Sequence, residues 1–293
     1  MIKLLILVSL ISFKAHAKLQ VITTTTNLAS LAKYIAGDHV EVKSLCLGVQ
    51  DPHFLEAKPS YIFKLSKADL LISVGAGLEV GWLPLIIQGS RNPKIREGQM
   101  RHLVASDFVE LLEARPVDIS RSQGDVHPEG NPHFMLAPSQ SIKVGKAIMD
   151  RLVLIDVKNQ STYENNFLTF KNQILEKAKL WKHIKDKKIK VVSYHKTLSY
   201  FYEEFGIQNV DVLEPKPGIP PSASHIIGLI HRMKKENVKK IIVENYFDET
   251  VAKRIQREIP GIIIEIVPVA VEGSKSVDDL FDLYNYLIKK IGA

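Results

Sequence analysis

The middle of the chain carries a helical pattern much longer than any other in the sequence. Apolar side chains recur at steps of three and four residues from Tyr163 to Trp181, which places them on one face of an α-helix over about 162–184. At 1.5 Å per residue this helix would be roughly 34 Å long, about the length of a small domain. Ser161 followed by Glu164 predicts a capping box at its start. We therefore expect two folded parts joined by a stiff helix.

Strand and helix patterns alternate on both sides of this helix. Short apolar runs indicate strands at 19–22, 40–47, 69–74, 189–194, 210–213, 238–244 and 262–267. Helical patterns lie between them at about 27–36, 59–65, 198–205, 222–235 and 248–258, and a last one covers 277–291. Asn27 is the expected cap of the first of these helices and Gly37 its expected end, and Ser222 or Ser224 is the expected cap of the helix 222–235. Such alternation favours mostly parallel sheets covered by helices on both faces. The expected fold is α/β, with two Rossmann-like lobes, and 293 residues suit two domains of about 150.

The first 17 residues are typical of a signal peptide. Lys3 precedes an apolar stretch over 4–13, and Ala15-His16-Ala17 follows the small-x-small rule for cleavage. The apolar stretch is about half the ~20 residues that a spanning helix needs. We therefore expect a mature chain that begins at Lys18.

Cysteine usage and charge limit the cellular compartments and the partners that suit this chain. Cys46 is the only cysteine, so an internal disulfide is impossible, and no cysteine lies at the cleavage site to carry a lipid anchor. Its apolar surroundings predict a buried thiol. The formal charge of +7 is spread along the chain among acidic residues, with no motif for reading DNA or RNA, so nucleic-acid binding is not expected. These features suit a soluble protein of the periplasm of a Gram-negative bacterium.

Three of the ten histidines lie at the ends of predicted strands or in loops. They are His53 in the loop 51–56, His133 after a loop rich in Gly and Pro, and His195 directly after the strand 189–194. Ligands of open α/β sheets bind at the carboxyl ends of strands. Imidazole is the commonest zinc ligand in proteins, and three imidazoles make a strong site. Because the three are far apart in sequence, each could also be an ordinary packed or solvated side chain.

Three short motifs carry a resemblance to a known family. Asp51-Pro52-His53, Asn131-Pro132-His133-Phe134 and Tyr194-His195, in this order and at these spacings, resemble the zinc- and manganese-specific substrate-binding proteins of bacterial ABC importers. The segments 23–29, 75–79 with Trp82-Leu83, and 214–222 fit as well, so that the resemblance covers essentially the whole mature chain.

The resemblance has several implications for this chain. It implies an N-terminal lobe over 18–160 that supplies His53 and His133, a linker helix over 161–185, and a C-terminal lobe over 186–293 that supplies His195. The metal would lie between the lobes. The partner would be the cognate ABC permease in the inner membrane, and we expect the receptor to act as a monomer without catalytic residues.

The sequence departs from the family pattern at the fourth ligand. Many relatives carry an aspartate at the end of a late strand, whereas the stretch 267–273 has none. Glu244, at the end of an apolar strand, is a candidate, either as a direct ligand or through a hydrogen bond to a ligand histidine. Glu272 and water are the alternatives. The stretch 113–129 holds only His127, so a His-rich loop that captures zinc is not expected.

Ligand type decides between the candidate metals. Three neutral imidazoles favour Zn²⁺, whereas Mn²⁺ prefers more carboxylate oxygen, so zinc is the first choice and manganese the alternative. A zinc-dependent hydrolase is the rival from another class, and Glu244 could serve it as a general base. Against this rival, the sequence lacks a compact metal-binding motif such as His-Glu-x-x-His. A siderophore- or vitamin-binding protein of the same shape, and a surface adhesin, are further alternatives.

Overall fold

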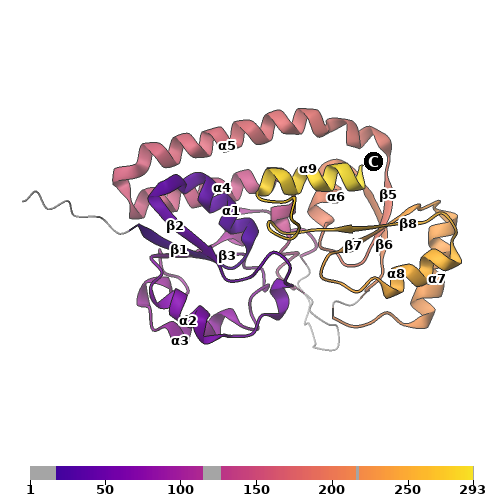
Figure 1. Ribbon diagram of the computed structural model, residues 1–293, viewed down its shortest axis with the longest axis horizontal. Coiled ribbons are helices and arrows are strands. Elements are labelled where there is room, and N and C mark those ends of the chain that lie inside the picture. Colours follow the sequence, from indigo (N-terminus) through magenta and orange to yellow (C-terminus); the bar gives the residue numbers. More distant parts are fainter. Residues whose placement is uncertain (1–17, 115–126, 216–217, 293) are drawn as a thin grey trace, which may run out of the picture.

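The computed structural model describes residues 18–114, 127–215 and 218–292, and the predicted signal peptide lies outside these ranges. Two four-stranded parallel sheets lie toward opposite ends of the molecule, with strand orders β2-β1-β3-β4 and β6-β5-β7-β8 (Figure 1). Both sheets have helices packed around them. The prediction of two α/β lobes is therefore confirmed.

The first lobe is built around strand β1. Its strands are β1 Leu19–Thr23, β2 Val40–Ser44, β3 Leu70–Ser73 and β4 His102–Val104. Its helices are α1 Thr26–Ala36, α2 Pro59–Ser66, α3 Leu83–Ser90 and α4 Pro138–Ile155. In this order the chain passes from β1 to its neighbour β2 on one side, and from β3 to its neighbour β4 on the other side. The boundary between β1 and β3 is therefore a topological switch point. Loops that follow these strands are thus placed to form a binding site. The strand β4 and the helices α3 and α4 are not among the elements predicted from the sequence.

The second lobe repeats this strand order. Its strands are β5 Lys190–Ser193, β6 Gln208–Val212, β7 Lys240–Glu244 and β8 Ile263–Val267, and its helices are α6 Ser199–Phe205, α7 Ala223–Lys235 and α8 Thr250–Glu258. Here β5 lies between β6 and β7. The Ser222 hydroxyl accepts a hydrogen bond from the backbone N–H of His225, so Ser222, and not the alternative Ser224, caps α7.

The predicted long helix is present as α5, Gln160–Trp181, and runs along one edge of the molecule (Figure 1). Its apolar stripe is buried as expected, at Tyr163, Phe167, Phe170, Ile174 and Trp181. The predicted capping box is wrong, because a 3₁₀ turn over Val157–Asn159 runs directly into α5 and leaves Ser161 inside the helix. No helix among the described residues, α5 included, is long and apolar enough to cross a membrane.

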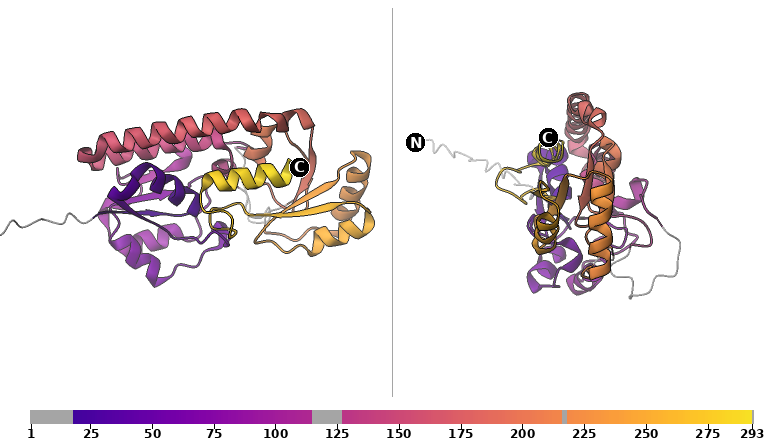
Figure 2. Two further views of the ribbon diagram at one scale, coloured as in Figure 1. Left: turned by 45° about the horizontal axis from the view of Figure 1, so that its top comes forward. Right: turned by 90° about the vertical axis from the view of Figure 1, so that its right-hand side faces the viewer.

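The C-terminal helix α9, Leu280–Ile291, spans the region between the two lobes (Figure 2). Its Tyr284 hydroxyl donates a hydrogen bond of 2.9 Å to the carbonyl of Met135 in the first lobe. At its far end, the Lys240 ammonium group of the second lobe donates to the carbonyl of Ile291 at 3.2 Å. Both α5 and α9 therefore connect the lobes, and one continuous apolar core runs through both.

The start of α1 differs from the prediction that Asn27 caps this helix. Thr25 is the N-cap residue, and Asn27 lies inside the first turn. The Asn27 carboxamide instead reaches the second lobe, where it donates to the carbonyl of Val269 at 3.1 Å and accepts from the N–H of Val271 at 2.8 Å. The end of α1 follows the prediction, because Gly37 adopts a positive φ of 56° that disfavours other residues.

Candidate metal centre

The three predicted histidines lie together between the lobes, and His127 joins them. The ring centroid of His53 lies 5.1 Å from that of His127, 5.2 Å from that of His133 and 6.3 Å from that of His195. The rings of His133 and His195 are 6.1 Å apart. Imidazoles that share a tetrahedral Zn²⁺ at about 2.0–2.1 Å have ring centroids roughly 5 Å apart. The first-lobe histidines already have the spacing for one ion, and His195 stands about 1 Å farther away.

The rings are gathered without forming a finished coordination shell. Within 18–114, 127–215 and 218–292, no three His, Cys, Asp or Glu side chains are arranged closely enough to hold an ion as they stand. Among the described residues, however, two buried ring nitrogens have no hydrogen-bond partner: Nε2 of the half-buried His133 and Nδ1 of His195. A buried polar atom without a partner costs free energy, and a metal ion would relieve this cost. The donor set therefore fits a metal that completes the site by small ring rotations.

His53 is the most firmly oriented of the four. It lies in the 3₁₀ turn Pro52–Phe54, whose N-cap Asp51 accepts hydrogen bonds from the His53 backbone N–H at 3.0 Å and from Nδ1 at 2.6 Å. Burial alone would raise the pKa of Asp51, but the hydrogen bonds and charge of His53 lower it overall. With Nδ1–H donating to a carboxylate, Nε2 is left as the free donor atom, as in carboxylate–histidine–metal arrangements.

His127 is a member of the cluster that the sequence analysis missed. Its Nε2 atom lies 3.0 Å from Nε2 of His53. Burial, and then the charges of His53 and His195, lower the pKa of His127 to about 4. Room for the ring exists because Gly77 has no side chain: a β-carbon there would lie 3.3 Å from Nδ1 of His127. The only sequence signal was that His127 is the single histidine in 113–129, which we had interpreted only as the absence of a His-rich loop.

The other two ligand candidates come from opposite lobes. His133 precedes the 3₁₀ turn Phe134–Leu136, and its backbone N–H donates to Oδ1 of Asn131 at 3.0 Å. Burial, and then the neighbouring histidines, lower the pKa of His133 well below its ordinary value. His195 follows β5 and is buried, with Nδ1 3.5 Å from Oε2 of Glu214. Asp51 and Glu214 thus each face Nδ1 of one histidine, but only Asp51 forms a hydrogen bond to it.

The two glutamates considered for the fourth ligand lie in different settings. Glu244 ends β7 and is fully buried, and neither of its carboxyl oxygens has a hydrogen-bond partner among the described residues. Burial raises the pKa of Glu244 to about 8, although the nearby Thr197 hydroxyl partly counteracts this. Glu272 is exposed and lines a separate surface groove that also contains Lys33 and Lys43. Neither carboxylate is hydrogen-bonded to the four imidazoles.

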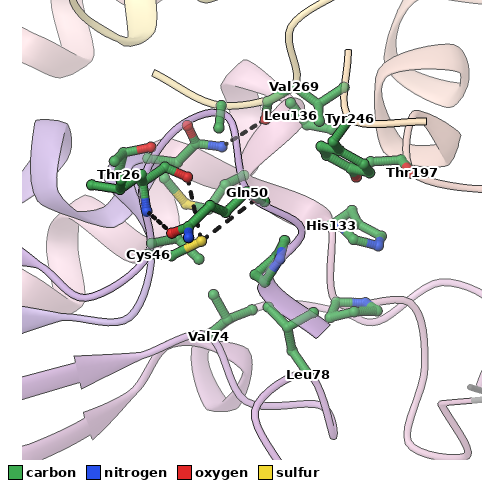
Figure 3. Close-up of a pocket in the computed structure, with 17 residues that line it drawn as sticks. Thr26, Cys46, Gln50, Val74, Leu78, His133, Leu136, Thr197, Tyr246 and Val269 are labelled. Atoms are coloured by element: carbon green, nitrogen blue, oxygen red, sulfur yellow. Dashed lines mark hydrogen bonds between the residues drawn. The ribbon is translucent and has the colours of Figure 1, made fainter. Parts of the chain in front are cut away.

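A small cavity lies beside His133, where the lobes meet (Figure 3). Its volume is about 50 Å³, and its lining includes Cys46 and Gln50 from the first lobe and Tyr246 from the second. Siderophores and vitamins need pockets of roughly 300–1,000 Å³, so this cavity does not suit such a ligand. Burial, and then the charges of Asp51 and Glu79, raise the pKa of Cys46 to about 12. Its thiol therefore stays protonated and is not a thiolate ligand.

Comparisons with known proteins agree with this geometry. The profile of the family ZnuA, described as the periplasmic component A of a zinc-uptake complex, matches residues 21–293. The manganese ABC transporter substrate-binding lipoprotein PsaA of Streptococcus pneumoniae is 27% identical over 285 residues, which cover 94% of this chain and 88% of that protein. The metal ABC transporter substrate-binding lipoprotein FimA of Streptococcus parasanguinis is 27% identical over 288 residues, which cover 94% and 89%.

Solved structures share the fold. A crystal structure of ZnuA superposes with a TM-score of 0.77 at 22% identity and covers 94% of this chain and 98% of that one. A periplasmic metal-binding protein from Candidatus Liberibacter asiaticus gives a TM-score of 0.75 at 20% identity, with coverages of 94% and 98%. The family consists of receptors, which excludes the hydrolase that the sequence left open. The chain belongs to the ZnuA family of metal-binding receptors that serve ABC transporters.

Proposed function

We propose that this protein binds Zn²⁺ outside the cytoplasm and delivers it to the permease of an ABC importer. The observation that carries the proposal is the gathering of four imidazoles from both lobes, with ring centroids 5.1–6.3 Å apart. The partnerless Nε2 of His133 supports it, because a metal would supply the missing interaction. In this proposal His53, His133 and His195 bind the ion, and His127 is the fourth donor.

Donor chemistry supports zinc above manganese. Neutral imidazole nitrogen suits Zn²⁺, whereas Mn²⁺ is held best by carboxylate and other oxygen ligands. The two carboxylates nearest the rings, Asp51 and Glu214, face Nδ1 atoms of histidines. Manganese is the alternative, because PsaA of Streptococcus pneumoniae is named for manganese and one structure of the Liberibacter protein holds Mn. Glu244 remains an alternative fourth ligand, which would add one oxygen to the shell.

Titration calorimetry on metal-stripped protein tests this assignment. We expect one equivalent of Zn²⁺ to bind, and to bind more tightly than Mn²⁺ in a competition titration. His133→Ala should abolish tight binding. The control His183→Ala removes an exposed histidine whose Nδ1 contacts only the carbonyl of Leu180 among its described partners, and should bind zinc like wild type. Tighter binding of Mn²⁺ than of Zn²⁺ would overturn the proposed metal.

The same proposal covers the partners of the receptor, its oligomeric state and its compartment. Family membership implies a permease and an ATPase as partners. We infer that the mature chain acts as a monomer in the periplasm after removal of residues 1–17. Light scattering of the purified mature chain tests the monomer, and mass spectrometry of protein recovered from the periplasm tests the start at Lys18. A lipid-modified or uncleaved N-terminus would contradict this localisation.

A further inference from the structure

Two buried asparagines of the first lobe form hydrogen bonds with the backbone of the second lobe. Asn27 and Asn131 are 8% and 6% exposed, so their carboxamides bond within the protein and not to bulk water. Each uses Nδ2 as donor and Oδ1 as acceptor at the same time. The two asparagines differ in the segments that they contact, because only Asn131 forms hydrogen bonds at or beside His133 and His195.

The Asn131 carboxamide joins the two ligand-bearing segments directly. Its Oδ1 accepts from the backbone N–H of His133 at 3.0 Å, within the first lobe. Its Nδ2 donates at 2.9 Å to the carbonyl of Lys196, the residue that follows His195 in the second lobe. One planar amide therefore contacts the backbone of a ligand in one lobe and the residue beside a ligand in the other.

The hydroxyl of a tyrosine in the second lobe holds the backbone of Asn131 in place. The hydroxyl of Tyr200 in α6 donates to the carbonyl of Asn131 at 2.7 Å and accepts from the N–H of Leu112 at 2.8 Å. The N–H of Asn131 in turn donates to the carbonyl of Leu112 at 2.8 Å. Every strong hydrogen-bonding group of Asn131 is thus paired, so that the amide plane has a defined orientation.

We propose that Asn131 is a positioning residue that sets the distance between His133 and His195, and thereby the affinity of the site for its metal. This inference rests on the proposed function, since it takes both histidines as ligands. Partners that orient metal ligands typically change metal affinity about 10–100-fold when they are removed. Asparagine suits the task because Ser is too short to reach both lobes and Asp has no N–H to offer Lys196.

Asn27 provides a matched control for this proposal. Its carboxamide also donates and accepts at once, but both bonds reach second-lobe backbone, at Val269 and Val271. Neither residue adjoins one of the four clustered histidines in sequence. Replacing Asn27 therefore removes a similar buried inter-lobe contact while leaving the segments of His133 and His195 in place.

The experiment compares Asn131→Ser, Asn27→Ser and His133→Ala in the full mature chain. Three quantities are measured for each variant: the melting temperature without metal, the zinc affinity by competition titration, and the visible spectrum of bound Co²⁺. We expect both asparagine variants to melt at lower temperature. Only Asn131→Ser should also weaken zinc binding, by about 10–100-fold, and alter the Co²⁺ spectrum, because only its ligand geometry changes.

The outcomes separate this inference from the function on which it rests. If His133→Ala binds zinc like wild type, the proposed function fails. If His133→Ala loses zinc while Asn131→Ser keeps wild-type affinity and spectrum, only the positioning role is wrong. Equal weakening in Asn27→Ser would also overturn it, in favour of general lobe docking. Should Asn131→Ser not fold, Tyr200→Phe removes the hydroxyl behind Asn131, and unchanged zinc affinity and Co²⁺ spectrum in that variant would overturn the proposal equally.

Discussion

Nε2 of His53 lies 3.0 Å from Nε2 of His127, although 74 residues separate them in the chain. Two imidazole nitrogens this close can share one proton or face one cation, but they cannot both carry a proton toward each other. Since Nδ1 of His53 is already paired with Asp51, its Nε2 is the atom available to a ligand. This arrangement supports the proposal that the two rings share one metal ion.

The first prediction concerns His127 as a donor. His127→Ala should weaken zinc binding at least by the ~10–100-fold that loss of a ligand's supporting partner costs. Zinc affinity is measured by competition titration, with His183→Ala as the control. Wild-type affinity in His127→Ala would show that this ring only packs beside His53, and would leave Glu244 or water as the fourth ligand.

The second prediction concerns the acid stability of the metal-free protein. The folded-state pKa of His127 is lowered to about 4 by burial and by its histidine neighbours. Between its ordinary value near 6.5 and about 4, the unfolded chain binds a proton at His127 that the folded chain does not. Stability from this group is complete above about pH 6.5 and is lost as pH falls toward 4, with a slope of about 1.4 kcal/mol per pH unit for one proton.

Because other groups titrate in the same range, this effect is measured as a difference. We expect wild type to lose stability relative to His127→Gln as pH is lowered from 6.5 to 4.5 in the presence of a chelator. Urea unfolding at several pH values gives the comparison. A stability difference that does not change with pH would mean that His127 titrates normally in the folded protein.

The third prediction concerns Glu244. Glu244→Gln should weaken zinc binding, by ~10–100-fold if the carboxylate acts through a ligand histidine and by more if it binds directly. The physical reason is that a carboxylate can ionise and offset part of the metal's charge in this buried region, whereas an amide cannot. Glu272→Gln is the control, since Glu272 is exposed in another groove. The assignment is wrong if Glu272→Gln is the variant that loses zinc.

The fourth prediction concerns the lobes. Zinc should raise the melting temperature, because a ligand that binds only the folded state stabilises it by RT ln(1 + [L]/Kd), about 2.7 kcal/mol at 100 times Kd. The radius of gyration should hardly change, since α5 and α9 both connect the lobes. Small-angle scattering with and without zinc tests this. A large decrease in radius on adding zinc would contradict it.

The sequence predicted the features that depend on local pattern. Alternating elements predicted the two lobes, and the stripe from Tyr163 to Trp181 predicted α5. The motifs around His53, His133 and His195, through their resemblance to a known family, predicted three members of the histidine cluster. The features it missed depend on contacts between distant segments. Nothing near His127 in sequence indicates that its ring meets His53.

Asn27 illustrates the same limit within one residue. Its place before an apolar helical pattern is typical of a cap, and local energetics alone favour that role. In the structure its carboxamide bonds to Val269 and Val271, more than 240 residues away. A tertiary contact of this kind overrides the local preference and leaves no periodic signal in the sequence.

The position of α9 has a consequence for the order in which parts of the molecule can fold. The Tyr284 hydroxyl, which donates to Met135, belongs to α9, yet it packs into the first lobe, which is synthesised well before it. Domains usually fold as units in order of synthesis. The first lobe lacks this contact until α9 has been synthesised, so we expect its packing to be completed only then.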